Sequence, residues 1–187
     1  LNYSNRQVQG LPKPSNRKTK KKLSRKPKVK MKQLVLHNDI HDAISAALSQ
    51  VEHHDTLFME WGLGKSVGYG RAVTLLFSGP PGVGKTACAE AIAAELKRPI
   101  LVADYSKIQN CYVGNTEKNI AKTFYTAQKE KAVLFWDEAD AMFYDRDSAS
   151  RNWEVRDVNV LLQELEKFEG VCILSTNRKI ALDKALA

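Results

Sequence analysis

Apolar residues form three short runs without polar alternation, at 72–77 (AVTLLF), 132–136 (AVLFW) and 171–175 (VCILS). Runs of this length are typical of strands that are buried on both faces, as in the parallel sheet of an α/β domain. We therefore predict that these three segments form the centre of one sheet.

Other segments repeat apolar residues every three or four positions, which is the spacing of one helix face. Asn38 or Asp39 can cap the first such helix, Thr116 can cap a later one, and Gly170 ends the last, over 154–169. Residues 87–97 (ACAEAIAAELK) are also helix-prone. Strands alternating with helices predict a three-layer α/β/α domain with a mostly parallel central sheet. The apolar helix positions are Ile40, Ala43, Ile44, Ala47, Leu48 and Val51, then Ile120, Phe124 and Ala127, then Val155, Val158, Leu161, Leu162, Leu165 and Phe168.

Positive charge is concentrated at the start of the chain. Of 187 residues, 43% are hydrophobic, which suffices for one sizeable core. Residues 1–32 contain twelve of the 29 Lys and Arg residues and no Asp or Glu. The remainder of the chain therefore has 17 basic and 21 acidic residues, a net charge of −4. Residues 1–33 are therefore expected to be a basic tail or linker, disordered or docked along another surface. A solvated linker, contact with nucleic acid or acidic protein, and a nuclear localisation signal are all left open.

The sequence has no run of about 18 apolar residues and no basic-then-apolar start, so neither a membrane span nor export is expected. Cys88, Cys111 and Cys172 lack CxxC spacing, which argues against a zinc site or a disulfide framework. These features favour a cytoplasmic protein, or a nuclear one if the source is eukaryotic.

A glycine-rich loop separates the first predicted strand from the helix-prone segment after it. Strand, Gly-x4-Gly-Lys-Thr and helix together form the context of a phosphate-binding P-loop. Glycines let successive N–H groups and the helix N-terminus approach a polyphosphate, Lys85 reaches the β and γ phosphates, and the Thr86 hydroxyl can ligate Mg²⁺. The residues expected to contact a nucleotide are Gly79, Pro80, Pro81, Gly82, Val83, Gly84, Lys85, Thr86 and Ala87.

Polar residues follow the other two predicted strands. Asp137 and Glu138 come directly after residue 136, and Asn177 follows the run 171–175. Ligands of an open α/β sheet lie beyond the carboxyl ends of its strands, so these side chains are expected beside the P-loop. There Asp137 can hold Mg²⁺, Glu138 can deprotonate an attacking water, and Asn177 can hydrogen-bond that water or the γ-phosphate.

These motifs resemble a known family. GPPGVGKT (79–86), VLFWDEAD (133–140) and ILSTN (173–177) look like Walker A, Walker B and sensor 1 of an AAA+ ATPase, and the resemblance runs from about residue 34 to the end of the chain. It implies the large α/β ATPase subdomain, with ATP or ADP and Mg²⁺ as ligands. The segment YVGNTEKN (112–119) is similar to the pore loop of members that thread proteins through a hexamer. By that resemblance Tyr112, Val113 and Gly114 would grip an extended polypeptide.

The resemblance also implies what the whole protein does. It would be a homohexamer that remodels, unfolds or disassembles protein substrates. Arginine fingers and a helical lid follow this region in the family, so residues 34–187 are expected to bind nucleotide but to hydrolyse it weakly without them.

Other functions are left open. One is an AAA+ ATPase acting on nucleic acid, such as a clamp loader, an initiator or a helicase-like enzyme, with the basic tail as its contact. Another is a nucleotide-gated scaffold. The letters DEAD also occur in RNA helicases, although the second domain of those enzymes is absent here. A cluster around Asp39, Ile40, Leu63 and Gly64 is a candidate for contact with the base.

Overall fold

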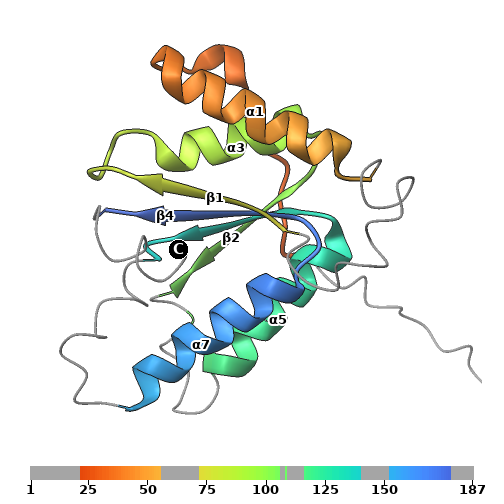
Figure 1. Cartoon of the computed structure of the whole chain (residues 1–187), viewed down its shortest axis with the longest axis vertical. Helices are drawn as coiled ribbons and strands as arrows, with labels where there is room; N and C mark the ends of the chain where they lie inside the picture. The colour runs from red at the N-terminus through yellow and green to blue at the C-terminus, as the bar shows by residue number, and fades with distance from the viewer. Residues whose placement is uncertain (1–21, 56–71, 106–107, 109–115, 140–151, 178–187) are drawn as a thin grey trace, which may run out of the picture.

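The computed structural model describes residues 22–55, 72–105, 108, 116–139 and 152–177. These residues form three layers, with the sheet between two pairs of helices (Figure 1). Helices α1 (Asn38–Asp55) and α3 (Lys85–Glu95) cover one face, and α5 (Thr116–Glu130) and α7 (Asn152–Lys167) cover the other. The predicted α/β/α architecture is confirmed.

The sheet has four parallel strands in the order β1-β4-β3-β2. They are β1 (Val73–Ser78), β2 (Ile100–Asp104), β3 (Val133–Asp137) and β4 (Val171–Thr176). β4 lies between β1 and β3, with Ser78 opposite Thr176 and Trp136 opposite Leu174. The ends of three strands that carry predicted site residues therefore meet at one edge of the sheet.

Each face of the sheet has its own hydrophobic core. Under α1 and α3 the core includes Ile44, Ala89 and Ile92. Under α5 and α7 it is built around Trp136, whose ring lies 5.8 Å from that of Phe124, centroid to centroid. All six residues of β4 are buried, as expected of a central parallel strand.

β2 is the strand that the sequence pattern did not predict. It pairs with β3 alone, from Ile100 opposite Val133 to Asp104 opposite Asp137. Its five residues follow the turn that ends α3, and a short apolar run in that position does not distinguish a strand from the end of a helix. Its last residue brings a further carboxylate to the edge where the site residues lie.

Part of the expected basic tail lies against the folded body. We call residues 22–33 the N-terminal strap. Arg25 forms an isolated antiparallel bridge with Ile100, the first residue of β2, and a short 3-10 helix, η1 (Met31–Gln33), follows. Two alternatives are expected for residues 1–33, disorder or docking along a surface. The strap, residues 22–33, is docked along a surface. Residues 1–21 lie outside the described part of the chain.

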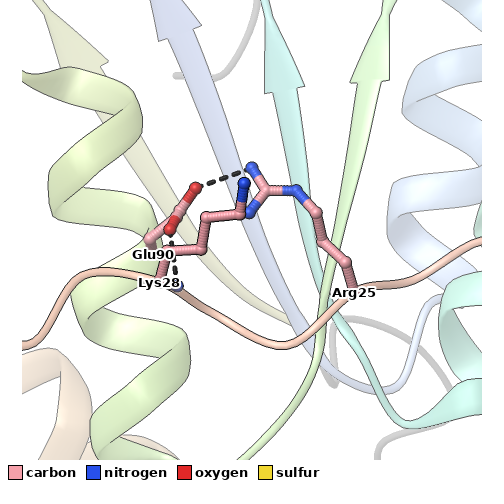
Figure 2. A network of polar contacts seen from close by, with 3 residues as sticks. All are labelled: Arg25, Lys28 and Glu90. Carbon is pink, nitrogen blue, oxygen red and sulfur yellow. Dashed lines mark hydrogen bonds and ion pairs between the residues drawn. The ribbon is translucent and has the colours of Figure 1, made fainter.

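One buried carboxylate explains why so basic a segment docks. Glu90 of α3 is 6% exposed and accepts hydrogen bonds from the Arg25 guanidinium at 2.6 Å and from the Lys28 backbone N–H at 2.7 Å (Figure 2). Burial would raise the pKa of Glu90, but the hydrogen bonds from Arg25 and Lys28 outweigh it and the pKa lies below its usual value. The carboxylate therefore stays charged and ties the strap to α3. Directly before Arg25, the Ser24 N–H donates a hydrogen bond to Glu130, the last residue of α5, at 2.9 Å.

Candidate nucleotide site

The glycine-rich loop occupies the sharp connection between β1 and α3. Gly82 and Gly84 have φ angles of 84° and 91°, in the left-handed region where a side chain costs energy. A Cβ at either position would meet no atom within 4 Å, so the need for glycine there comes from the backbone angles and not from crowding within the chain. The loop consequently presents its backbone with open space in front of it, as a phosphate cradle requires.

The N-terminus of α3 faces the same space. Gly84 is its N-cap residue, and the first helical hydrogen bond runs from the Cys88 N–H to the Gly84 carbonyl. The N–H groups of Lys85, Thr86 and Ala87 precede that bond, and no acidic side chain lies in the first turn. Unpaired N–H groups and the positive end of the helix dipole favour an anion at this position.

Lys85 connects the loop with the end of β4. Its Nζ donates hydrogen bonds to the carbonyls of Gly79 at 2.7 Å and Pro80 at 3.0 Å, and to Asn177 Oδ1 at 2.9 Å. Asn177 directly follows β4, and a backbone bond from the Gly79 N–H to the Thr176 carbonyl, at 3.2 Å, ties the two segments again. The sequence predicted that both side chains lie at this edge but not that they contact each other. The predicted Lys85 and Asn177 are therefore brought together across 92 positions of sequence.

The acidic pair lies one strand further along. Asp137 ends β3, and its Oδ1 accepts a hydrogen bond from the Glu138 N–H at 3.1 Å. Glu138 has a φ of 53°, which is unusual for a residue with a side chain, and its side chain is exposed. The next residue is held by the bond from the Ala139 N–H to the Ser175 carbonyl. This strained turn directs the chain away just after β3 and leaves both carboxylates at the sheet edge.

The donor set suits a hard divalent cation. The Thr86 hydroxyl and the Asp137 carboxylate are oxygen ligands of the kind that Mg²⁺ prefers, and Mg²⁺ takes few protein ligands when phosphates supply the rest. Asp137 ends β3 and Thr86 lies in the first turn of α3, which follows β1, and only β4 separates β1 from β3. The residues present therefore fit a phosphate-bound Mg²⁺.

An apolar cavity of about 390 Å³ opens beside the loop, between α1 and β1. Asp39 and Ile40 of α1 line one side, and Val83 and Gly84 of the loop line another. Ile40 and Val83 are 50% and 58% exposed, although both are large apolar residues. A cavity of this size is in the range of small-molecule pockets, and its apolar walls suit a flat ring. Asp39 and Ile40 are the predicted candidates for contact with the base, and Val83 is among the residues expected to contact a nucleotide.

Several predicted residues lie outside the described part of the chain. These are the pore-loop residues Tyr112, Val113 and Gly114, and the base candidates Leu63 and Gly64. The described chain resumes at Thr116, the first residue of α5.

Comparison with known proteins agrees with this geometry. Residues 75–187 match the family model described as "ATPase family associated with various cellular activities (AAA)". The match begins within β1 and includes the glycine-rich loop, the acidic pair and Asn177. The chain belongs to the AAA family of ATPases. Nucleotide binding and ATPase activity are general properties of this family.

Relatives of this AAA chain come from bacteria and eukaryotes. An uncharacterized AAA family ATPase, y4kL, of Sinorhizobium fredii is 43% identical over 115 residues, which are 60% of this chain and 35% of the relative. The peroxisomal ATPase PEX6 of Dictyostelium discoideum is 36% identical over 156 residues, 80% of this chain and 12% of that protein. A mouse nuclear valosin-containing protein-like protein is 33% identical over 153 residues, with 79% and 17% covered. The AAA chain thus spans about a third or less of each of these relatives. In its described residues, no helix is both long and apolar enough to cross a membrane.

Proposed function

We propose that this domain binds ATP with Mg²⁺ and hydrolyses it, and that the whole protein uses this cycle to remodel protein substrates. The base would enter the cavity between α1 and the loop, and the phosphates would lie over the loop and the N-terminus of α3. The single observation that carries the proposal is the hydrogen bond from Lys85 to Asn177, because it joins the phosphate-binding loop to the strand end where a γ-phosphate would lie.

Each site residue then has a distinct role. Lys85 would exchange loop carbonyls for the β and γ phosphate oxygens, and its bond to Asn177 would keep the ammonium at the γ position. Asn177 would orient the attacking water with its amide, and Glu138 would accept the proton of that water. Thr86 and Asp137 would hold Mg²⁺, which when bound neutralises charge on the phosphates.

The proposed proton acceptor can be tested by turnover. We expect Glu138→Gln, in the full-length protein, to retain nucleotide binding and to lose at least about 100-fold in the rate of phosphate release, since it removes the base but keeps the shape. Glu166→Gln, an exposed acid on α7, is the control and should hydrolyse ATP at the wild-type rate. Wild-type turnover by the Glu138 variant would refute the assignment, and absence of turnover in the wild-type protein would favour a nucleotide-gated scaffold.

For the whole protein we propose a homohexamer that threads polypeptides, with Tyr112 contacting the substrate. Similarity to proteins named PEX6, valosin-containing protein-like and the ATP-dependent zinc metalloprotease FtsH supports remodelling of proteins as the function class. An aromatic ring offers apolar area that can hold many sequences without reading one. Arginine fingers and a lid would be supplied by parts of the protein beyond residue 187.

Tyr112 distinguishes this function from action on nucleic acid. We expect Tyr112→Ala in the full-length protein to keep basal ATPase activity and to abolish unfolding of a tagged fluorescent protein, and Tyr112→Phe to retain most unfolding because the ring is preserved. Unchanged unfolding by Tyr112→Ala together with loss of DNA-stimulated ATPase would favour the nucleic-acid alternative. Sizing the full-length protein with and without ATP would test the ring of six.

A further inference from the structure

The N-terminal strap presents lysines on one side only. Lys26, Lys28 and Lys30 are exposed, whereas Pro27 and Val29 between them are half-buried. Alternation of this kind is that of an extended chain laid on a surface, with successive side chains pointing to opposite sides. Lys32, in η1, is exposed as well and continues the row. We call these four residues the lysine row.

The strap is fixed without using the row's side chains. The bonds to Glu90 come from the Arg25 guanidinium and from the backbone of Lys28, and Arg25 also forms the bridge to Ile100 (Figure 2). Met31 packs against the core under α1 and α3. Within the described part of the chain, no carboxylate lies within ion-pair distance of the four lysine ammonium groups. The row is therefore a set of uncompensated cations held on a rigid support.

None of the four row lysines lines the cavity beside the nucleotide loop. The strap begins beside the starts of the strands, whose arrows point toward the loop between β1 and α3 (Figure 1), and it ends with η1, which packs against α3. The bridge from Arg25 to the first residue of β2 agrees with this placement. An anion bound to the row would not occupy the site proposed for ATP.

We propose that the lysine row binds the phosphate backbone of nucleic acid, without sequence preference. Alternate residues of an extended chain are about 6.6 Å apart, so Lys26, Lys28 and Lys30 offer evenly spaced cations to a polymer with regular charges, and Lys32 follows them in η1. Phosphate contacts need only cations and release counterions. A protein partner would require an apolar centre to the interface, and the apolar residues at positions 27, 29 and 31 are turned toward the domain. Because the strap is already ordered, binding would cost little conformational entropy.

The test is a salt titration of binding by the complete 187-residue chain, without nucleotide. A fluorescein-labelled 20-nucleotide oligo-dT is the probe, and anisotropy is the readout. One variant replaces the four row lysines by Gln. A matched control replaces four exposed lysines of α5 and α7 by Gln and so has the same net charge: Lys118, Lys122, Lys129 and Lys167. The unfolding midpoint of each variant establishes that it is folded.

The slope of log affinity against log salt is about −0.7 for each phosphate neutralised on a single strand. We expect the row variant to lower the magnitude of the slope by up to about 3 and the affinity at low salt by at least about tenfold. The control should behave like the wild-type chain, and saturating Mg-ATP should not displace the oligonucleotide.

Three results would overturn the proposal. Equal losses in the row and control variants would mean that net charge alone causes binding. Displacement by Mg-ATP would place the oligonucleotide on the P-loop. Equal binding of a labelled 20-residue poly-glutamate, with the same dependence on the row, would identify an acidic protein as the partner. None of these results depends on hydrolysis, so they leave the proposed ATPase function unaffected.

Discussion

The glycine-rich loop and the N-terminal strap both suit anions, but they do so by different means. At the carboxyl ends of the strands the loop uses backbone conformation, with Gly82 and Gly84 at positive φ and a helix N-terminus behind them. The strap, which lies along α3, uses side chains, with exposed lysines and a buried carboxylate that holds the segment in place. Backbone N–H groups define a compact site for one polyphosphate, whereas a row of long cationic side chains suits an extended polyanion.

The difference also concerns how each region is stabilised. The loop is tied to β4 by Lys85 and by the Gly79 N–H, both within a continuous sheet. The strap is held by side chains from two helices: Glu130 of α5, and Glu90, the one acid on the buried and otherwise apolar part of α3. A change at Glu90 should therefore affect stability first, whereas a change in the loop should affect ligand binding first.

The largest effect is expected from Gly84→Val. A β-branched residue at a φ of 91° is strained by roughly 1–3 kcal/mol and its side chain would fill the space in front of the loop. We expect nucleotide affinity to fall at least about 100-fold, measured by calorimetric titration. Gly79→Ala is the control, because the φ angle of Gly79 is not positive and the new Cβ would lie 3.4 Å from Val83 Cγ2, an ordinary contact. Similar affinities of the two variants would show that the backbone angle at Gly84 is not required.

A smaller effect, on stability, is expected from Glu90→Gln. Glutamine keeps only one acceptor oxygen and no charge, so it cannot serve both the Arg25 guanidinium and the Lys28 N–H, and we expect the free energy of unfolding in urea at pH 7 to fall by about 1–3 kcal/mol. Glu95→Gln, an exposed acid at the end of the same helix, should change it little. Nucleotide affinity should be nearly unchanged in both variants, which separates the strap from the loop.

The stability difference should depend on pH in a defined direction. The pKa of Glu90 in the folded chain is lowered, so its contribution is complete above the unfolded pKa of about 4.3 and is lost as the pH falls through the folded value. The difference between the wild-type chain and Glu90→Gln should therefore be constant from pH 7 to about 5 and shrink below about 4. A difference that grew on acidification would contradict the ion pair.

The smallest effect is expected from Asn177→Ala. It removes one of three hydrogen bonds of the Lys85 ammonium, which corresponds to about 0.5–1.5 kcal/mol, or up to about tenfold in nucleotide affinity. Gln163→Ala, which removes an exposed amide on α7, is the control. A loss as large as that of Gly84→Val would mean that Asn177 contacts the nucleotide more directly than the geometry suggests.

Much of the fold could be predicted because it depends on local pattern. The apolar runs at 72–77, 132–136 and 171–175 correspond to β1, β3 and β4, and the periodic segments correspond to α1, α5 and α7. β2 could not be predicted with the same rules, because its four apolar residues after a helix end fit either element. Its identity depends on pairing with β3, which is a tertiary contact.

The site was predictable to the same degree. Spacing placed Lys85, Asp137 and Asn177 at one sheet edge, because glycine-rich loops and strand ends have a fixed geometry in α/β folds. The hydrogen bond between Lys85 and Asn177 joins residues 92 positions apart, and the bond between Arg25 and Glu90 joins residues 65 positions apart. No local rule contains such distances. The alternation K-P-K-V-K (26–30) is a readable signal of an extended segment, but the density of charge indicates disorder more strongly.

The central claim is that the glycine-rich loop and its lysine bind a nucleotide together with Mg²⁺. The most direct measurement is calorimetric titration of the 187-residue chain with Mg-ATP, for the wild type, Lys85→Ala and the control Lys118→Ala, an exposed lysine of α5. We expect one saturable site in the wild type and the control, and at least about a 100-fold loss in Lys85→Ala because a charge-assisted contact to phosphate is removed. Equal affinities of the wild type and Lys85→Ala, or no saturable binding by the wild type, would contradict the account.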